Sequence, residues 1–237
     1  TESWRSTPDG TLHAFCHAVP GRWHLMGVML SGAGSLDWFR HAVMPDLAED
    51  PEPFARIESL AGQSPAGAEG LLFLPYLSGE RTPHPDANAR GAFIGLDHRH
   101  DRTHLARAVF EGVTHGLTDC LDLVRETGVE AGSVRLSGGG MKSRLWKQTC
   151  ADLFQAPVVT TTTTEGTAFG AAILAAVGAG RFSNVSDACS AWVHETTRLQ
   201  PGPDVEVLAE RHAVYSKLYP ALADLNSAIC RSRETAP

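Results

Sequence analysis

The chain lacks the features that mark several large classes of protein. Its 237 residues contain no apolar run of about 18 residues, so no segment is expected to cross a membrane. It has no block of lysines and arginines, and its formal net charge is −7, which argues against an extended nucleic-acid surface. The five cysteines are far apart and never form C-x-x-C. We therefore expect reduced thiols and a cytoplasmic location, not a disulfide framework.

The first residues read as the interior of a longer polypeptide. Thr1 is not a methionine, residues 1–8 are polar, and no signal peptide is visible. We therefore expect a fragment of a longer protein. With 43% apolar residues, 237 residues suffice for one large domain or two small ones.

Strands and helices are expected to alternate along most of the chain, which predicts an α/β fold. The expected strands cover residues 12–19, 23–30, 71–76, 134–136 and 157–161. Helices are expected after the turn at 31–35 and over 53–61, 103–127, 143–154, 166–177, 185–192 and 204–229. Thr103 is expected to cap the longest of these and Gly128 to end it, while Pro220 is expected to kink the last.

Three consecutive glycines, Gly138, Gly139 and Gly140, stand where a strand gives way to a helix. Missing side chains there let a ligand approach the backbone N–H groups. The segment is not a dinucleotide motif, because Ser143 occupies the place of its third glycine, and it is not a P-loop, because no G-K-[ST] follows. A simple tight turn remains the alternative interpretation.

A second turn of small residues, 31–35, also opens a helix. It fails the dinucleotide pattern too, because Asp37 stands where the third glycine belongs. Both turns read as concavities lined by N–H groups and suited to phosphate or adenosine. A third segment, 164–167, reads either as a helix N-cap or as a place where a ligand or another backbone comes close.

The polar side chains do not identify a reaction by themselves. Histidines gather in two places, His13 with His17 and His98 with His100 and His104. Neither group is joined by a cluster of cysteines or carboxylates, so no structural metal is expected. The loop 79–86 reads either as a solvated turn with a local Glu80–Arg81 pair or as a loop that closes over a partner or orders the cleft. No carboxylate stands with a partner that marks a general base, among Asp37, Glu80, Glu111 and Glu165.

Four segments together resemble the FGGY family of carbohydrate kinases. Residues 91–96, followed after seven residues by 104–111, meet every position of that family's C-terminal signature. The loop 73–84 and the segment 13–26 are typical of members that phosphorylate D-xylulose. Residues 138–140 and 165–172 resemble the family's adenosine-binding region. The similarity covers nearly the whole chain.

The resemblance implies an RNase H-like α/β fold of the actin/Hsp70 type. It implies that residues 1–237 are the nucleotide-binding C-terminal domain of a two-domain sugar kinase, incomplete at its N-terminal end, with the sugar-binding domain absent. The full-length protein is then expected to phosphorylate D-xylulose at O5 with ATP and Mg²⁺. No D-x-G-T phosphate loop is present, and the general-base aspartate is expected to lie outside this chain.

The resemblance also implies nucleotide contacts and no metal ligands or catalytic residues in this chain. Gly139 and Ser143 are expected at the base and ribose, although many relatives carry Asn in place of Ser143. Gly138 and Gly140 shape that loop. The residues expected near the phosphates or base are Gly32, Ala33, Gly34 and Asp37.

Other functions stay open. The parent protein could act on another sugar or polyol, such as glycerol, gluconate or ribulose, because most sugar contacts lie outside this chain. Alternatively, the chain could be a non-catalytic actin-fold interaction module. A homodimer is expected from the resemblance, and neither nucleic acid nor membrane is expected as a partner.

Overall fold

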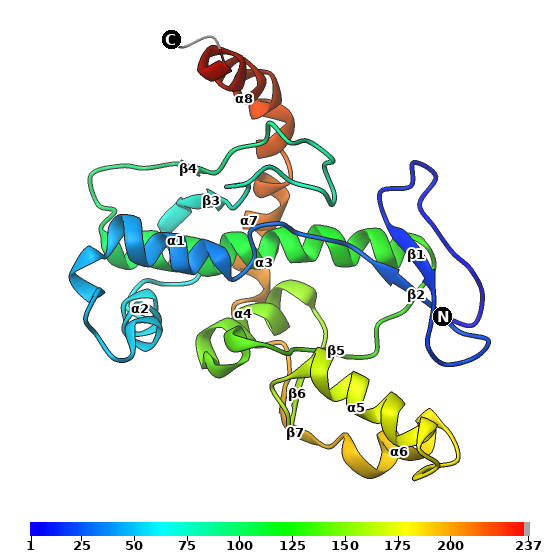
Figure 1. Cartoon of the computed structure of the whole chain (residues 1–237). Coiled ribbons are helices and arrows are strands. Elements are labelled where there is room, and N and C mark those ends of the chain that lie inside the picture. The colour runs from blue at the N-terminus through cyan, green and yellow to red at the C-terminus, as the bar shows by residue number, and fades with distance from the viewer. Residues whose placement is uncertain (235–237) are drawn as a thin grey trace.

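One long helix, α3 (Arg102–Glu126), runs through the middle of the molecule, and the other elements surround it (Figure 1). The computed structural model describes residues 1–234. The strands are β1 (His13–Cys16), β2 (Trp23–Met26), β3 (Leu72–Leu74), β4 (Ala92–Ile94), β5 (Val134–Arg135), β6 (Val158–Thr161) and β7 (Glu195–Leu199). The other helices are α1 (Gly34–Val43), α2 (Pro53–Ala61), α4 (Arg144–Phe154), α5 (Gly166–Gly178), α6 (Val185–Trp192), α7 (Val205–Tyr215) and α8 (Leu218–Glu234). The α/β class is confirmed, and within residues 1–234 no helix is long and apolar enough to cross a bilayer.

α3 begins one residue earlier than the sequence predicts. The Asp101 carboxylate accepts a hydrogen bond from the backbone N–H of Thr103 (2.9 Å), and the His104 ring accepts one from the N–H of Asp101 (3.3 Å). The prediction that Thr103 caps the helix is therefore wrong, because Asp101 already reaches the free N–H groups of the first turn. Gly128, with φ of +80°, follows the end of the helix as expected.

The middle of α3 is buried on all sides. Every residue from 106 to 116 is buried, including several polar side chains. A Cβ atom added at Gly112 would lie 2.1 Å from the carbonyl oxygen of Phe73 in β3. Glycine is therefore required at this position for β3 to lie directly on the helix.

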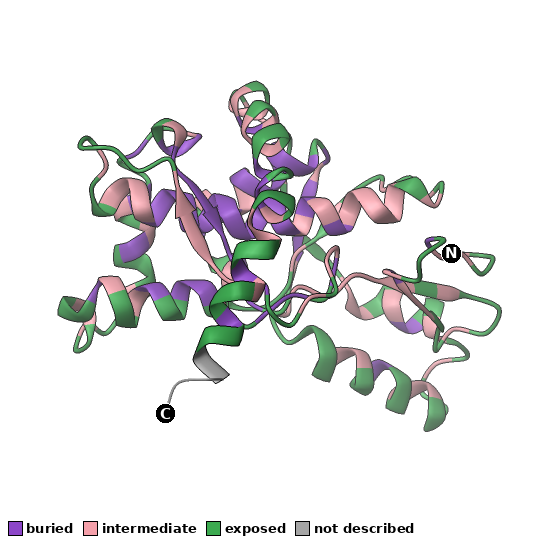
Figure 2. Cartoon of the chain, turned by 90° about the horizontal axis from the view of Figure 1, so that it is seen from above, coloured by how far each residue is buried: buried purple, intermediate pink, exposed green. Residues whose placement is uncertain are grey.

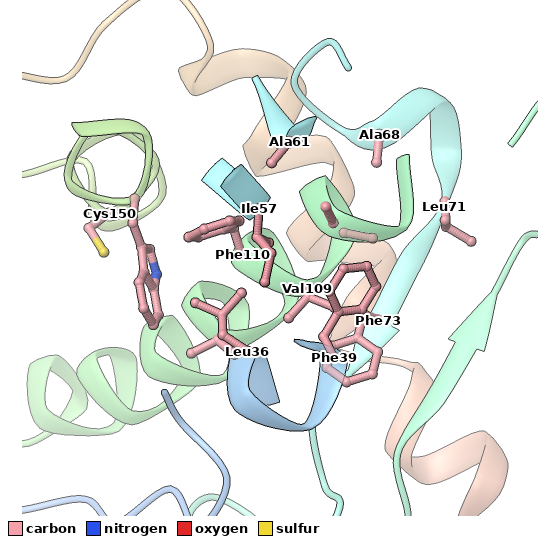
Figure 3. Close-up of a cluster of buried hydrophobic side chains, with 14 of the residues drawn as sticks. Leu36, Phe39, Ile57, Ala61, Ala68, Leu71, Phe73, Val109, Phe110 and Cys150 are labelled. Carbon is pink, nitrogen blue, oxygen red and sulfur yellow. The ribbon is translucent and has the colours of Figure 1, made fainter. Parts of the chain in front are cut away.

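The hydrophobic core forms around this segment of α3 (Figure 3). Leu36 and Phe39 come from α1, Ile57 comes from α2, and Val109 and Phe110 come from α3. Each of these five side chains is at most 6% exposed. Full burial of one such side chain contributes about 1.5–3 kcal/mol, so packing holds α1 and α2 against α3.

Within residues 1–234 the strands form three separate sheets. β5 pairs with β6 in parallel, and β6 pairs with β7 antiparallel, with a bulge between Thr160 and Thr161. β1 pairs with β2, and β3 with β4, both antiparallel. The strands predicted at 12–19 and 23–30 are present as β1 and β2 with shorter bounds, whereas β4 and β7 were not predicted. β4 is only three residues long and β7 is mostly polar, so pairing with β3 and β6 decides their conformation.

α5 is apolar along its whole length and yet largely exposed. It contains no charged residue, and Ile173 is its one buried residue. Its covered side faces α6, where the rings of Phe169 and Trp192 lie 6.4 Å apart. On the open side, Leu174 is 44% exposed. Among residues 1–234, nothing covers this side of the helix.

The C-terminal region forms two helices and not the single kinked helix predicted for 204–229. α7 ends at Tyr215 and α8 begins at Leu218. Pro220 lies in the first turn of α8, where a missing N–H costs no intrahelical hydrogen bond. α8 leads away from the body of the molecule, and its C-terminal part is largely exposed (Figure 2).

A buried polar cluster joins α7 to α3. The Nδ1 atoms of His115 and His212 lie 3.3 Å apart, and Nε2 of His212 lies 3.5 Å from a carboxylate oxygen of Asp119. His115 is fully buried, and this burial lowers its pKa to about 3. Burial, with the nearby Asp122 as a smaller cause, raises the pKa of Asp119 to about 7. Ionised Asp119 is therefore unfavourable in the folded state.

Replacing Gly112 by alanine is predicted to destabilise the fold by about 2 kcal/mol or more, because the new methyl group meets the Phe73 carbonyl at 2.1 Å. Chemical denaturation measures the change. Gly170→Ala is the matched control, because a Cβ atom there meets nothing within 4 Å. Inside α5 it is predicted to stabilise by about 0.5–1 kcal/mol. Equal effects of the two variants would contradict the close approach of β3 to α3.

Asp119→Asn is predicted to change how stability depends on pH. Since the folded-state pKa of Asp119 is raised from 3.8 to about 7, the folded protein binds more protons than the unfolded chain between these values. The contribution of Asp119 to stability is thus present below about pH 4 and is lost as the pH rises to about 7. The unfolding temperature of the variant, relative to that of the wild type, should be higher at pH 8 than at pH 5. Asp224→Asn, on exposed α8, should show no such gain.

Candidate functional site

The glycine turn (residues 138–143) connects β5 to α4 and exposes backbone at two of its three glycines. Gly138 has φ of +85° and ψ of −175°, a conformation that favours glycine. A Cβ atom at Gly138 or Gly139 would meet nothing within 4 Å, so both face open space. At Gly140 it would lie 2.8 Å from the ring of Trp146. The three glycines therefore have different roles, and Gly140 is required for packing.

Ser143 ends the glycine turn and caps α4. Its side-chain oxygen accepts a hydrogen bond from the backbone N–H of Trp146 (3.0 Å), and the residue is only 9% exposed. The hydroxyl keeps its own proton available, because capping uses only its acceptor capacity. The N–H of Ser143 also donates to the carbonyl of Gly140 (3.1 Å), which joins the cap to the glycine turn.

The loop between β6 and α5 lies beside the glycine turn. The N–H of Gly138 donates to the carbonyl of Thr164 (3.3 Å). A Cβ atom at Gly166 would lie 3.4 Å from Oγ of Ser137. The two loops meet because β5 and β6 are parallel neighbours, so their carboxyl ends reach the same edge. Glu165 occupies the N-cap position of α5, but its side chain makes no capping hydrogen bond.

The α1 turn (residues 31–34) provides a second exposed backbone segment. The carbonyls of Ser31 and Gly32 accept from the N–H of Ser35 (3.2 and 3.0 Å), which closes the first turn. Gly34 meets nothing within 4 Å of an added Cβ atom, and Ala33 is exposed. The backbone N–H groups of residues 32–34 have no hydrogen-bond partner among the described residues, whereas the next three N–H groups donate to carbonyls of the turn.

Asp37 lies on the first turn of α1 within a small charged group. Its carboxylate lies 3.3 Å from Arg40 and 3.6 Å from His41. The Asp37 side chain is 55% exposed, so these contacts contribute little to stability. They do place positive charge beside the carboxylate near the α1 turn.

Both turns rest on the same part of α3. The indole N–H of Trp146 in α4 donates to the hydroxyl of Thr114 (3.0 Å), and its ring meets Phe110 edge to face at 5.4 Å. Leu36, from the first turns of α1, belongs to the same core as Phe110 and Trp146. The structure thus brings residues 138–143 into contact with 164–166. The α1 turn and the glycine turn are both held against α3, the first through Leu36 and the second through Trp146.

Neither of two hollows on the surface of residues 1–234 is lined by the expected nucleotide residues. One of about 510 Å³ lies beside the β6–α5 loop and is lined by Thr162, Thr163, Phe169, Ala191, Trp192 and His194. The other, of about 360 Å³, lies between α2 and the start of α3. Within residues 1–234, no group of three or more His, Cys, Asp or Glu side chains is placed to hold a metal ion.

The sequence allowed the loop 79–86 to be a solvated turn, and the structure does not show it as one. Glu80 and Thr82 are 3% and 0% exposed. The Glu80 carboxylate accepts the backbone N–H of Arg81 and that of Leu30, the residue before the α1 turn. Sequence reasoning singled out Glu80 without assigning it a role, and the link to Leu30 depends on a tertiary contact.

Comparison with known proteins identifies the family of this chain. The model of the C-terminal domain of the FGGY family of carbohydrate kinases matches residues 5–179. The chain belongs to this family.

The named relatives are longer proteins, and this chain aligns with less than half of each of them. A xylulose kinase of Staphylococcus epidermidis is 41% identical over 212 residues, which are 89% of this chain and 42% of that protein. A xylulose kinase structure from Lactobacillus acidophilus superposes with a TM-score of 0.85 at 28% identity, over 96% of this chain and 45% of that one. A gluconate kinase structure from the same organism superposes with a TM-score of 0.84 at 27% identity, over 96% of this chain and 45% of that one. The chain thus spans less than half the length of these relatives.

Gly138→Ala is predicted to destabilise the protein by about 1–3 kcal/mol, because a side chain is strained at φ of +85°. Gly139→Ala is the neighbouring control, which we expect to stay within about 0.5 kcal/mol because its Cβ atom meets nothing and its φ is not positive. Urea denaturation of both variants measures the difference. Similar stabilities for the two would show that the turn does not have this backbone conformation.

Proposed function

We propose that this chain is the nucleotide-binding half of an ATP-dependent sugar kinase. The observation that supports this most directly is the open backbone at Gly138 and Gly139, beside the carboxyl ends of two parallel strands. Ligands of open α/β sheets bind outside the carboxyl ends of the strands. Membership of a carbohydrate kinase family makes ATP the ligand of choice.

In this proposal adenosine lies against the glycine turn. Gly139 offers backbone without a side chain in the way, and Gly138 sets the direction of that backbone. Gly140 leaves room for Trp146, which anchors the turn to α3. Ser143 caps α4 and can donate its remaining proton to a ribose oxygen.

The phosphates of ATP lie toward the α1 turn. Gly32, Ala33 and Gly34 present the free N–H groups of a helix start, where the helix dipole favours negative charge. Arg40 beside Asp37 reduces the repulsion that this carboxylate exerts on a phosphate. ATP supplies the transferable phosphoryl group, and Mg²⁺ is held mainly by phosphate oxygens and water.

The part of this chain in catalysis is to position the nucleotide. Holding ATP by its adenosine and its phosphates fixes the direction in which the terminal phosphoryl group points, and in-line phosphoryl transfer depends on such alignment. The general base and most of the sugar site lie in the rest of the kinase. The isolated chain is therefore proposed to bind nucleotide without turning it over.

Residues 1–237 are proposed to be one C-terminal domain that more of the polypeptide completes. The exposed apolar side of α5 and the free edge of β5 support this, because both normally become covered. So does the isolated β1–β2 hairpin, since two-stranded sheets are marginally stable alone. The N-terminal domain of the whole kinase would carry the sugar site.

D-xylulose is the proposed sugar, phosphorylated at O5. The names of the relatives and the loop 73–84 support it. D-gluconate is the second candidate, because the gluconate kinase structure superposes almost equally well. A homodimer stays a prediction from the family resemblance.

Binding of Mg-ADP to the purified chain tests the nucleotide half of the proposal. Calorimetry should show binding by the wild type and at least a tenfold weaker affinity for Gly139→Val, because the side chain fills the space that adenosine needs. Gly132→Val is the matched control, since Gly132 is also open and lies in the loop before β5. No binding by the wild type, or equal weakening by both variants, contradicts the site.

A coupled assay of ADP release tests the proposed catalytic activity and the proposed sugar. With Mg-ATP and D-xylulose, D-gluconate or glycerol, the isolated chain should show no sugar-dependent turnover, while the chain joined to the remainder of its polypeptide should prefer D-xylulose. Preference for D-gluconate would replace the proposed substrate. Absence of turnover by the whole protein with each sugar would favour a non-catalytic module. Turnover by the isolated chain would mean that its base lies within these residues.

A further inference from the structure

The segment that leads from β2 into α1 (residues 27–30) lies tightly against α3. A Cβ atom at Gly27 would come within 3.0 Å of Cβ of Cys120. From the other side, a Cβ atom at Gly116 would come within 2.7 Å of the sulfur of Met29. Two glycines, one on each surface, therefore allow the segment to lie on the helix. Its path determines where the α1 turn begins.

A second segment contacts residues 27–30 through hydrogen bonds. We call residues 80–82 the clamp. The backbone N–H of Thr82 donates to the carbonyl of Val28 (3.0 Å), and the Thr82 hydroxyl accepts from the N–H of Val28 (3.0 Å). Oε1 of Glu80 accepts from the N–H of Leu30 (3.0 Å). The pairs 82 with 28 and 80 with 30 run antiparallel, with side-chain oxygens acting as the acceptors that strand backbones usually supply.

The clamp is itself held by the core. The thiol of Cys120 in α3 lies 3.5 Å from the carbonyl of Thr82. Oε1 of Glu80 also accepts the N–H of Arg81 (2.7 Å), which fixes the carboxylate relative to its own backbone. Residues 27–30 therefore contact both α3 and the clamp, while Leu30 itself stays 49% exposed.

Burying the Glu80 carboxylate is energetically unfavourable if its contacts are purely structural. It is 3% exposed, and burial raises its pKa. Its second oxygen, Oε2, is buried and has no hydrogen-bond partner among the described residues. A buried carboxylate with an unsatisfied oxygen is unfavourable compared with a neutral side chain. Such groups concentrate at functional sites, and the N–H that Glu80 holds lies immediately before the α1 turn.

We propose that Glu80 is a positioning residue that holds the α1 turn in place for the phosphates of the nucleotide. The carboxylate fixes Leu30, Leu30 fixes Ser31, and the Ser31 carbonyl closes the first turn of α1. Glu80 does not contact the nucleotide. This inference rests on the proposed function, because it assigns the α1 turn to the phosphates and the glycine turn to adenosine.

Glu80→Ala is predicted to weaken Mg-ADP binding about tenfold while changing adenosine affinity less than about twofold. Only the phosphates depend on the α1 turn, so a general loss of structure would weaken both ligands together. Glu80→Gln retains a carbonyl oxygen that can accept from Leu30, and should keep Mg-ADP affinity within about threefold of the wild type. Calorimetry with both ligands, well below the unfolding temperature, provides these numbers.

The matched control is Glu111→Gln. Glu111 is another buried carboxylate (1% exposed) that accepts a backbone N–H, from Gly67 at 2.9 Å, and it also pairs with Arg107. Its loss should lower the unfolding temperature without changing the ratio of Mg-ADP to adenosine affinity. If it changes that ratio as Glu80→Ala does, the effect is one of stability and the inference fails.

Amide hydrogen exchange examines the clamp without any ligand. Glu80→Ala should raise exchange at Leu30 and Ser35, and leave Trp146 in α4 at its wild-type rate. Unchanged exchange at Leu30, or equal losses of Mg-ADP and adenosine affinity, would overturn the positioning role. Faster exchange together with no Mg-ADP binding by the wild type would instead reject the proposed function, and with it the assignment of the α1 turn to phosphates.

Discussion

The close packing of β3, α1, α2 and α4 around the buried middle of α3 is the constraint on which the rest of the structure depends. Gly112 lets β3 reach the helix at backbone distance, and Phe110 and Thr114 hold Trp146 in place. The glycine turn and the α1 turn both begin from elements that pack here. A helix that is buried in its middle thus supports two turns whose backbone is exposed, which suits a site that must be preorganised.

The candidate site combines two kinds of support. Apolar packing fixes α1 and α4, whereas hydrogen bonds from the clamp fix the segment that enters α1. Packing is not directional, so it can set the position of a helix more easily than the orientation of a few N–H groups. Glu80 and Thr82 supply the directional part, and the unsatisfied Oε2 of Glu80 is the unfavourable consequence.

Local patterns were sufficient for most helices. Apolar spacing predicted α2 and α6 at their observed bounds and α4 to within one residue. It failed where neighbours decide: β4 and β7 exist through pairing, Asp101 and not Thr103 caps α3, and the last helix divides before Pro220. The glycine turn could be located from residues 138–140, but the packing role of Gly140 depends on Trp146, six residues later.

The sequence by itself determined the α/β class, most helix positions and membership of a carbohydrate kinase family, because these depend on local periodicity and on motifs contiguous in the chain. Only the tertiary structure decided that Glu80 and Thr82 of the loop 79–86 are buried and that Glu80 reaches the N–H of Leu30, fifty positions away along the chain. It also decided which glycines face open space. Contacts between distant segments are selected by packing in three dimensions, and no local pattern of residue types records them.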